Sequence, residues 1–540
     1  MVITKKSNKN GKQPPGDAIH KLDYRFIDEL RSVPIGMELG DNQTYLDHIF
    51  EDCSDFVIRE FQLEKSAKAM LLFIDGMVNT EQVNEAMKSL MILEGGEQFV
   101  DNISASVLPV SQIQPADNYG DLLLGVLGGD TGLIVERNNK ALLLGIRGPE
   151  KRSIAEPETE SVIRGPREGF TESLRTNTSM IRRKLKTPHL KMKPMTIGRE
   201  SNTNVAVTYL SDLADPGVVD EVVGRLQQID IDAVLESGYI EEFIQDSAYS
   251  PFPQIQYTER PDMVAAALLQ GRVGILVDGT PNVLLVPFTF SEILQASEDY
   301  YERFQISTLI RWLRYIFLLL SLLTPSLYVA FTTFHQDLLP TTLLLSAAAA
   351  REAIPFPAVV EALIMEITFE ALREAGIRLP KTIGSAVSIL GALVVGQAAV
   401  QAGIVSAPMV IVVSITGIAS FTIPRFNGAI AVRMLRFPIL IVSSIFGLYG
   451  IMIALMVILG HMASLRSFGV PYLSPVGPLS SGDLKDVLIR SPWWLMRNRP
   501  AFMPVQDSER MSMDLPQEIM KESGQRGKTI EHPSAEEGET

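Results

Sequence analysis

Five charged side chains interrupt an apolar stretch of this chain. In such surroundings a carboxylate can attract cations or pair with an arginine. Pro357 to Ile377 is predicted to be a helix rich in Leu, Ile, Met, Phe and Ala. A carboxylate at the centre of a bilayer costs about 2.5 to 3.5 kcal/mol. Several carboxylates therefore require a cavity, charged partners or a position at the membrane interface. The charged positions are Glu361, Glu366, Glu370, Arg373 and Glu374.

The spacing of these charges predicts one charged face. At 100° per residue, four of the five lie within an arc of about 100°, and Glu361 lies apart from them. Glu366 and Glu370 form an unfavourable like-charge pair one turn apart, which two ion pairs can offset. The face is either a cation-attracting vestibule or a ring of ion pairs between subunits, or it belongs to an interfacial helix whose charges lie in water. The two offsetting pairs are Glu370 with Arg373 and Glu374 with Arg378.

The next apolar segment, Ile383 to Val405, is predicted to span a membrane and is rich in Gly, Ala and Ser. Small residues allow helices to approach closely in lipid, and Gln397 and Gln401 need a partner helix or water. Lining a pore and packing inside an oligomer both explain this composition. The candidate pore or vestibule residues are Glu361, Glu366, Glu370, Arg373, Ser388, Gly391, Val395, Gln397 and Gln401.

Motifs of other chemistries are incomplete. Gly391 to Gly396 has the glycine spacing of a phosphate loop, but Gln397-Ala398 follows it in place of Lys-Ser or Lys-Thr. The six histidines have no metal-ligand spacing, and no G-x-S-x-G sequence is present. The lone Cys53 suits a reducing compartment and is most simply a small buried residue. We therefore expect no enzyme, no cofactor and no metal site.

A basic segment interrupts the acidic chain. Residues 164–193 carry nine Arg or Lys against two Glu, whereas the whole chain has a formal net charge of −15. The acidic balance argues against nucleic acid as a partner. The segment is predicted to contact anionic lipid headgroups or acidic surfaces of partner subunits, or to be a solvated linker helix. The candidate contact residues are Arg164, Arg167, Arg175, Arg182, Arg183 and Lys184.

Hydrophobic residues make up 46% of the 540 residues and are unevenly distributed, which predicts an α/β soluble N-terminal region of two subdomains followed by an all-α polytopic membrane domain. No apolar run precedes Met70, so no cleavable signal peptide is expected, and the N-terminal region is predicted to be cytoplasmic. The predicted divisions are 1–39, a disordered polar N-terminus; 40–150, α/β subdomain 1; 151–200, a basic linker with a helix; 201–304, α/β subdomain 2; 311–465, a membrane domain of four to five spans; and 466–540, a tail that is mostly disordered after 507.

Short apolar runs that end at turns predict the strands of the soluble region. Ile74-Asp75-Gly76 and Val277-Asp278-Gly279 look alike, but three residues are too few to establish a duplication. A helix is expected to begin at Asp215-Pro216. The predicted strands are Met70 to Ile74, Gly132 to Glu136, Ala141 to Gly145, Val205 to Tyr209, Val273 to Val277 and Val283 to Pro287.

Four apolar runs are predicted to cross the membrane, and Leu338 to Ala350 is either re-entrant or a fifth span. Four crossings return the C-terminal tail to the cytoplasm but place Arg425, Arg433 and Arg436 outside, where other chains could bury them. Pro492-Trp493-Trp494 suits an interfacial anchor. The predicted spans are Trp312 to Phe334, Ile383 to Val405, Met409 to Ile423 and Phe437 to Leu465.

Four longer segments carry a family resemblance. Gly165 to Arg183, Asp215 to Asp230, Pro355 to Glu366 and Gly384 to Ala402 closely resemble the A subunits of bacterial endospore germinant receptors, the GerA family. The resemblance covers about residues 40 to 505. It implies a multi-pass protein of the spore inner membrane with a two-part cytoplasmic N-terminal domain.

The resemblance also implies partners and a process. The A subunit would work beside a permease-like B subunit, thought to receive the nutrient, and a lipoprotein C subunit. Such complexes respond to amino acids or sugars and trigger ion release and germination, and the A subunits are thought to form a homo-oligomeric ion channel. A secondary transporter and a non-conducting membrane scaffold of the same complex are the alternatives.

Overall fold

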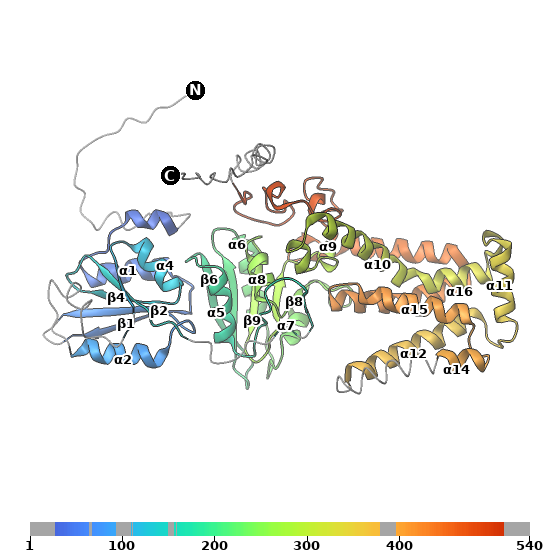
Figure 1. Ribbon diagram of the computed structural model, residues 1–540, viewed down its shortest axis with the longest axis horizontal. Coiled ribbons are helices and arrows are strands. Elements are labelled where there is room, and N and C mark those ends of the chain that lie inside the picture. The colour runs from blue at the N-terminus through green and yellow to red at the C-terminus, as the bar shows by residue number, and fades with distance from the viewer. Residues whose placement is uncertain are drawn as a thin grey trace, which may run out of the picture. The chain divides into compact units, whose positions relative to one another are not determined.

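The computed structural model describes residues 27–63, 67–92, 110, 112–148, 156–157, 159–378 and 396–511. The chain divides into two compact units. The first comprises residues 1–159, 167–240 and 257–285, and it contains most of the β-structure. The second comprises residues 160–166, 241–256 and 286–540, and long helices dominate it (Figure 1).

The first sheet is antiparallel, with strand order β1-β2-β4-β5-β3. Its central strands are apolar on both faces because helices cover both: α1 and α4 pack on one side and α2 on the other (Figure 1). The elements are a 3₁₀-helix Ile27–Ser32, α1 Leu39–Ile49, β1 Phe56–Gln62, β2 Lys68–Ile74, α2 Thr80–Met91, β3 Ile113–Ala116, α4 Tyr119–Leu127, β4 Thr131–Val135 and β5 Ala141–Leu144.

The second sheet has strand order β6-β7-β9-β10-β8, and α5 and α8 pack together against it. The predicted helix start is confirmed, since the Asp215 carboxylate accepts a hydrogen bond from the Gly217 amide and Pro216 is the first residue of α6. The elements are α5 Leu174–Lys184, β6 Leu190–Ile197, β7 Thr203–Leu210, α6 Pro216–Gln227, α7 Ser237–Ile244, β8 Gln256–Thr258, α8 Pro261–Leu268, β9 Val273–Val277 and β10 Val283–Val286.

The two sheets repeat one topology: in each, the first strand lies at the edge and is followed in space by the second, fourth, fifth and third. The two similar Asp-Gly turns do not mark this repeat, because they follow β2 and β9, which hold different places in it. Both turns contact the start of α5 instead. Asp75 pairs with Arg175, and the Asp278 carboxylate accepts a hydrogen bond from the Leu174 amide at 2.9 Å.

The six predicted strands are confirmed as β2, β4, β5, β7, β9 and β10, but the prediction missed the four edge strands of the two sheets, β1, β3, β6 and β8. Of these, β1 and β6 carry charged residues among apolar ones, as strands with one solvent face do, whereas β3 and β8 have only four and three residues. Since α5 and β6 belong to the second sheet and its covering layer, residues 151–200 are more than a linker. Residues 27–39 are not disordered, because Leu30 and Ile35 are buried in the first core.

In the second unit, α10 and α16 are long and apolar enough to cross a membrane, judged by length and composition. The apolar α15 is shorter, at 15 residues, and α11 has 11. The number of spans stays a prediction. The elements are α9 Phe290–Ile293, α10 Phe304–Thr333, α11 Thr341–Arg351, α12 Ala358–Arg378, α14 Gly396–Gln401, α15 Ala407–Phe421, α16 Phe426–Ser464, β11 Arg466–Ser467, β12 Val470–Pro471, and 3₁₀-helices Ser297–Tyr300, Gln336–Leu338, Leu484–Asp486 and Trp493–Leu495.

The helix α16 reverses direction at Gly447, whose φ of 60° and ψ of −139° suit only glycine. A Cβ atom at Gly447 would lie 2.6 Å from Cε1 of His335. A Cβ atom on Gly450 would lie 2.5 Å from the Val442 carbonyl oxygen, which a straight helix would place about 12 Å away. The prediction of Phe437 to Leu465 as a single span is therefore wrong: residues 426–446 and 448–464 form two antiparallel arms.

We call the end of the helical unit at which α10 begins the proximal end, and the opposite end the distal end. Gly428, near the start of α16, lies against Ile293 at the proximal end, and Gly447 lies against the distal end of α10. The second arm returns, since His461 Nε2 lies 2.9 Å from Ser250 Oγ and the neighbouring Phe252 packs in the proximal core. Both ends of α16 thus lie at the proximal end.

Candidate functional site

The predicted helix of glutamates is confirmed as α12, and its isolated carboxylate has a separate role. Glu361 is fully buried and accepts hydrogen bonds from Arg351 Nε at 3.1 Å and from the Ser406 amide at 3.0 Å. Ser406 is the N-cap of α15, whose N-terminus favours a negative charge. Glu361 therefore joins α11, α12 and α15 at the distal end.

Glu366 forms a buried ion pair between α12 and the first arm of α16. Its Oε2 atom lies 2.6 Å from Nη1 of Arg436, and both side chains are at most 1% exposed. Nε of Arg436 also donates to the Ser321 carbonyl of α10 at 2.9 Å. Removing one partner of such a pair leaves an uncompensated buried charge, at a cost of about 3 to 5 kcal/mol. Three helices are therefore tied together at this level.

Glu370 lies one turn nearer the proximal end and has two arginine partners. Its carboxylate is 3.0 Å from Arg433 of α16 and 3.6 Å from Arg373 of its own helix. The Arg373 guanidinium stacks over the rings of Phe369 and Phe421, with centroid distances of 5.1 and 4.7 Å. The two predicted ion pairs on this helix, Glu370 with Arg373 and Glu374 with Arg378, are confirmed.

We call Glu366, Glu370, Arg373, Arg433 and Arg436 the ladder. Arg433 and Arg436 were expected outside the membrane in a loop, but they lie on α16 and neutralise α12 within the same chain. The span predicted from hydropathy began only at Phe437, because the two charged arginines before it interrupt the apolar run. The interpretation of α12 as an interfacial helix with its charges in water is wrong for Glu366, which is buried and paired.

Four polar atoms of the ladder, among the residues that the structure describes, are buried without a hydrogen-bond partner in the chain: Glu366 Oε1, Glu370 Oε1, Arg373 Nε and Arg436 Nη2. Buried polar atoms require partners. Since the set offers both donors and acceptors, water or a small ion can satisfy it. The arrangement can therefore hold solvent or ions between the helices.

The other candidate pore residues are not brought into the ladder. Ser388, Gly391 and Val395 lie outside the described residues, and Gln397 and Gln401 are exposed on α14. No group of three or more His, Cys, Asp and Glu side chains that could hold a metal ion occurs in the described ranges.

In the basic segment, Arg182 cannot contact lipid or a partner, and that prediction is wrong. Its side chain is fully buried and donates to both oxygens of Asp55, at 2.9 and 2.8 Å. Burial opposes its charge, but Asp55 outweighs burial and raises the pKa of Arg182. The sequence could not reveal this, because Asp55 lies more than a hundred residues earlier, just before β1.

Three other members of the basic set have acidic partners within the chain. Arg175 pairs with Asp75, Lys184 lies 2.9 Å from Glu168, and Arg164 lies 4.0 Å from Glu302. Arg167 is exposed, and Arg183 is half-buried, which lowers the pKa of its guanidinium. Acidic partners from outside this segment, Asp55, Asp75 and Glu302, therefore neutralise three of its seven net positive charges.

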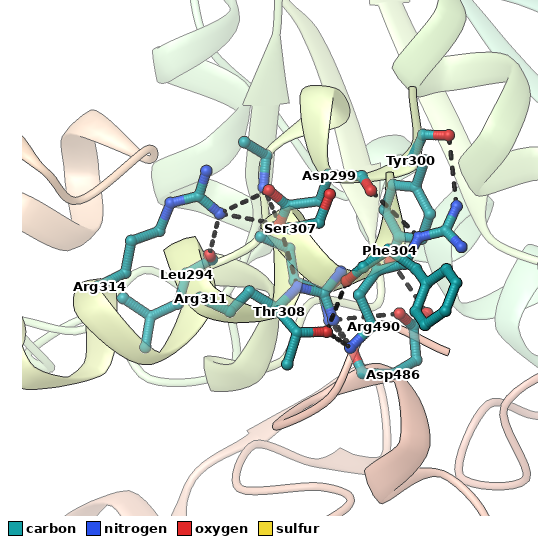
Figure 2. Close-up of polar contacts among 12 residues, drawn as sticks. Leu294, Asp299, Tyr300, Phe304, Ser307, Thr308, Arg311, Arg314, Asp486 and Arg490 are labelled. Atoms are coloured by element: carbon teal, nitrogen blue, oxygen red, sulfur yellow. Dashed lines mark hydrogen bonds and ion pairs between the residues drawn. The ribbon is translucent and has the colours of Figure 1, made fainter. Parts of the chain in front are cut away.

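A second charged cluster, which sequence reasoning missed, holds the proximal end of α10 (Figure 2). Asp299 is 2% exposed and accepts hydrogen bonds from Arg311 Nε at 3.0 Å and Arg314 Nη1 at 2.8 Å. Nη1 of Arg314 also donates to the Leu294 carbonyl at 3.1 Å. The signal available in the sequence was a short acidic stretch, with Glu298, Asp299 and Glu302, before two arginines on the first turns of a long apolar helix.

The C-terminal segment is part of this cluster (Figure 2). Asp486 lies 3.1 Å from Arg311 Nη1 and accepts a hydrogen bond from the Tyr300 hydroxyl at 3.0 Å. Burial raises the pKa of Asp486, although Arg311 and Tyr300 oppose the shift. Arg490 donates from Nε to the Asp299 carbonyl and from its amide to Thr308 Oγ1, both at 3.1 Å. The tail is thereby fixed to the start of α10.

These features define a class: a duplicated α/β region followed by apolar helices whose charges pair between helices. Residues 44–502 match the family described as Bacillus/Clostridium GerA spore germination protein. This chain belongs to that family, as its resemblance predicted.

Similarity to two proteins of Bacillus subtilis extends along most of the chain. Uncharacterized membrane protein YfkQ of Bacillus subtilis (strain 168) is 52% identical over 476 residues, which cover 88% of this chain and 93% of that protein. Spore germination protein KA of the same organism is 46% identical over 483 residues, covering 88% and 89%. The crystal structure of the N-terminal domain of the A subunit of the Bacillus megaterium spore germinant receptor GerK3 is 36% identical, with a TM-score of 0.39, and covers 48% of this chain and 97% of that one.

Proposed function

We propose that this chain is the A subunit of a nutrient germinant receptor in the spore inner membrane. It works with a permease-like B subunit and a lipoprotein C subunit, and it responds to amino acids or sugars by triggering ion release. As a homo-oligomer, it acts as a ligand-gated ion channel with its N-terminal region in the cytoplasm. Membership of the GerA family over residues 44–502 supports the process.

The ladder carries the mechanistic part of the proposal. Charged residues inside a membrane bundle are costly and are retained for function. Because Arg433 and Arg436 neutralise the glutamates within the chain, the ladder is not a bare cation-attracting ring. Its role is to couple α12 to α16, so that a movement started by the partner subunit reaches Ser388 to Gln401 near the conduction path.

The directions of the helices support an even number of crossings. The chain leaves α12 at the proximal end and enters α15 at the distal end, and α16 contributes two arms. If Ile383 to Val405 is a span that joins those two ends, the chain crosses the membrane six times. The N-terminal α/β region and the C-terminal tail then lie on the same side of the membrane. A secondary transporter is less favoured because the duplication that the described residues contain lies in the α/β region.

Flux measurements on the purified protein in liposomes test the function. A channel gives ion currents with its partner subunits and germinant present, a transporter gives germinant flux, and a scaffold gives neither. Substitutions along Ser388 to Gln401 are expected to alter the ion currents. Germinant flux without ion currents would contradict the channel.

Charge exchange across the ladder tests the coupling. Glu366→Arg or Arg436→Glu alone places two like charges in one buried site and is expected to lower ion flux at least tenfold, the effect of about 1.4 kcal/mol. The double exchange restores the pair and is expected to recover part of the flux. Glu374→Arg with Arg378→Glu is the matched control, because that pair is exposed. If the double exchange lowers ion flux as much as either single exchange does, and cross-linking shows normal oligomers, coupling through this pair is refuted.

A further inference from the structure

We propose that the C-terminal segment 488–495 and the first turns of α10 form one lipid-binding surface that anchors the proximal end of the helical unit in the headgroup region of the membrane. The inference rests on the proposed membrane location of α10. It adds a surface made of two segments far apart in the sequence. We call this surface the belt; its members are Ile306, Leu309, Trp312, Leu488, Ile489 and Trp493.

The belt is apolar and exposed, although charged side chains lie buried directly beneath it. Leu309 is 58% exposed, Trp312 51%, Ile489 51% and Trp493 47%. Beneath them, Asp299, Arg311 and Arg490 are each at most 2% exposed and bond to one another or to backbone carbonyls. These three charged side chains therefore face inward beneath an exposed apolar surface, which is opposite to the arrangement expected for a surface in water.

Direct contacts join the two halves of the belt. The Trp312 indole N–H donates to the Leu488 carbonyl at 2.8 Å, and that of Trp493 donates to the Tyr300 carbonyl at 3.3 Å. The ring of Trp494 packs edge-on against Phe304, with centroids 6.1 Å apart. Because both indole donors are satisfied by the chain, the rings can enter the boundary between headgroups and acyl chains without losing a hydrogen bond.

The continuity of the belt with α10 favours lipid over a protein partner. Leu313 and Ile316 extend the exposed apolar face of α10 from the belt toward the distal end. If this helix crosses the membrane, its proximal turns lie at the interface, where Trp is enriched. The tail supplies the second half of the same face, held there by Asp486 and Arg490 rather than by a helix of its own.

The three tryptophans of the chain, Trp312, Trp493 and Trp494, all lie at this surface, so their fluorescence reports on it directly. The full-length protein is placed in phosphatidylcholine vesicles whose acyl chains carry bromine either near the headgroup or deep in the bilayer. Replacing two tryptophans at a time by Phe leaves one reporter. We expect shallow bromines to remove most of the emission of Trp312 and Trp493 and deep bromines to remove less; Trp494, which is less exposed, is the matched control.

The outcomes separate the inference from the function on which it rests. If lipid bromines quench Trp312 but not Trp493, a second copy or another protein covers the tail and the belt is wrong, while the membrane location stands. If neither is quenched, the membrane location fails as well.

Arg490→Gln is expected to release the tail, so that quenching of Trp493 by shallow bromines falls while quenching of Trp312 is kept. Unchanged quenching of Trp493 would refute the role of the cluster.

Discussion

At the scale of single residues, buried and half-buried charges of this chain are defined by partners distant in sequence. Glu236 illustrates this in the α/β region. Burial opposes its ionisation, but hydrogen bonds from Ser237, Gly238, Thr280 and Asn282 outweigh burial and lower the pKa of Glu236. Its carboxylate therefore clamps the turn between β9 and β10 to the start of α7.

The lowered pKa of Glu236 predicts a pH dependence. A carboxyl group whose pKa is depressed on folding stabilises the fold above its unfolded pKa, about 4.3 for Glu, and loses that effect as the pH falls through the folded value. At pH 7 we expect slower hydrogen exchange at Gly238 and Thr280 in the natural protein than in Glu236→Gln, and the two should converge as the medium is acidified. Glu242→Gln, at an exposed position of α7, is the control and should match the natural protein throughout.

At the scale of elements, glycine geometry and ion pairs decide what hydropathy leaves open. A straight α16 of 39 residues would be about 58 Å long, nearly twice a bilayer core. The reversal at Gly447 yields arms of about 31 and 26 Å, which match one crossing each. The ladder and the Asp299 cluster then hold α10, α12 and α16 together.

Cysteine labelling tests the reversal. In a Cys53→Ala background, Tyr449→Cys lies beside Gly447 and Ser464→Cys lies at the end of the second arm; both positions are exposed. We expect a membrane-impermeant maleimide to label them from opposite sides of oriented vesicles. Labelling of both from one side would mean that residues 448–464 do not cross. Arg466→Cys, which is exposed just beyond the end of the second arm, is the control for the proximal side.

At the scale of the whole molecule, each unit is built by joining distant segments. In the first unit, residues 52–54 pair with β6 of the second sheet: the Met192 amide donates to the Asp52 carbonyl at 2.8 Å, and Ser54 Oγ donates to the Met192 carbonyl at 2.8 Å. Arg182 and Asp55 lie beside this contact. The two copies of the repeat are therefore linked through one buried ion pair and an edge strand.

Removal of Arg182 should loosen this link. Arg182→Met leaves the buried Asp55 carboxylate without its partner, so we expect a loss of about 3 to 5 kcal/mol. Hydrogen exchange of β1 and β6 amides in the full-length protein measures it. Asp55→Asn with Arg182→Met leaves no unpaired charge and should recover most of the loss. Arg199→Met removes an exposed pair with Asp230 and should change the exchange of these amides little; a similar loss from Arg199 and Arg182 would argue against a special role for the buried pair.

The sequence by itself determined the class of fold, six of the strands, the glutamate helix and the family, because apolar runs, caps and long motifs are local signals. It also determined the pairs Glu370 with Arg373 and Glu374 with Arg378, which lie one turn apart. It missed the edge strands β1, β3, β6 and β8. The charged faces of β1 and β6 hide their apolar pattern, and β3 and β8 have only four and three residues.

Only the tertiary structure decided which distant groups meet. It paired α12 with arginines that the sequence had placed in a loop, buried Arg182 against Asp55, folded α16 back at Gly447 and brought the C-terminal tail to the start of α10. The physical reason is that a buried charge requires a partner of opposite sign, and composition cannot reveal which of many candidates packing brings within 3 to 4 Å.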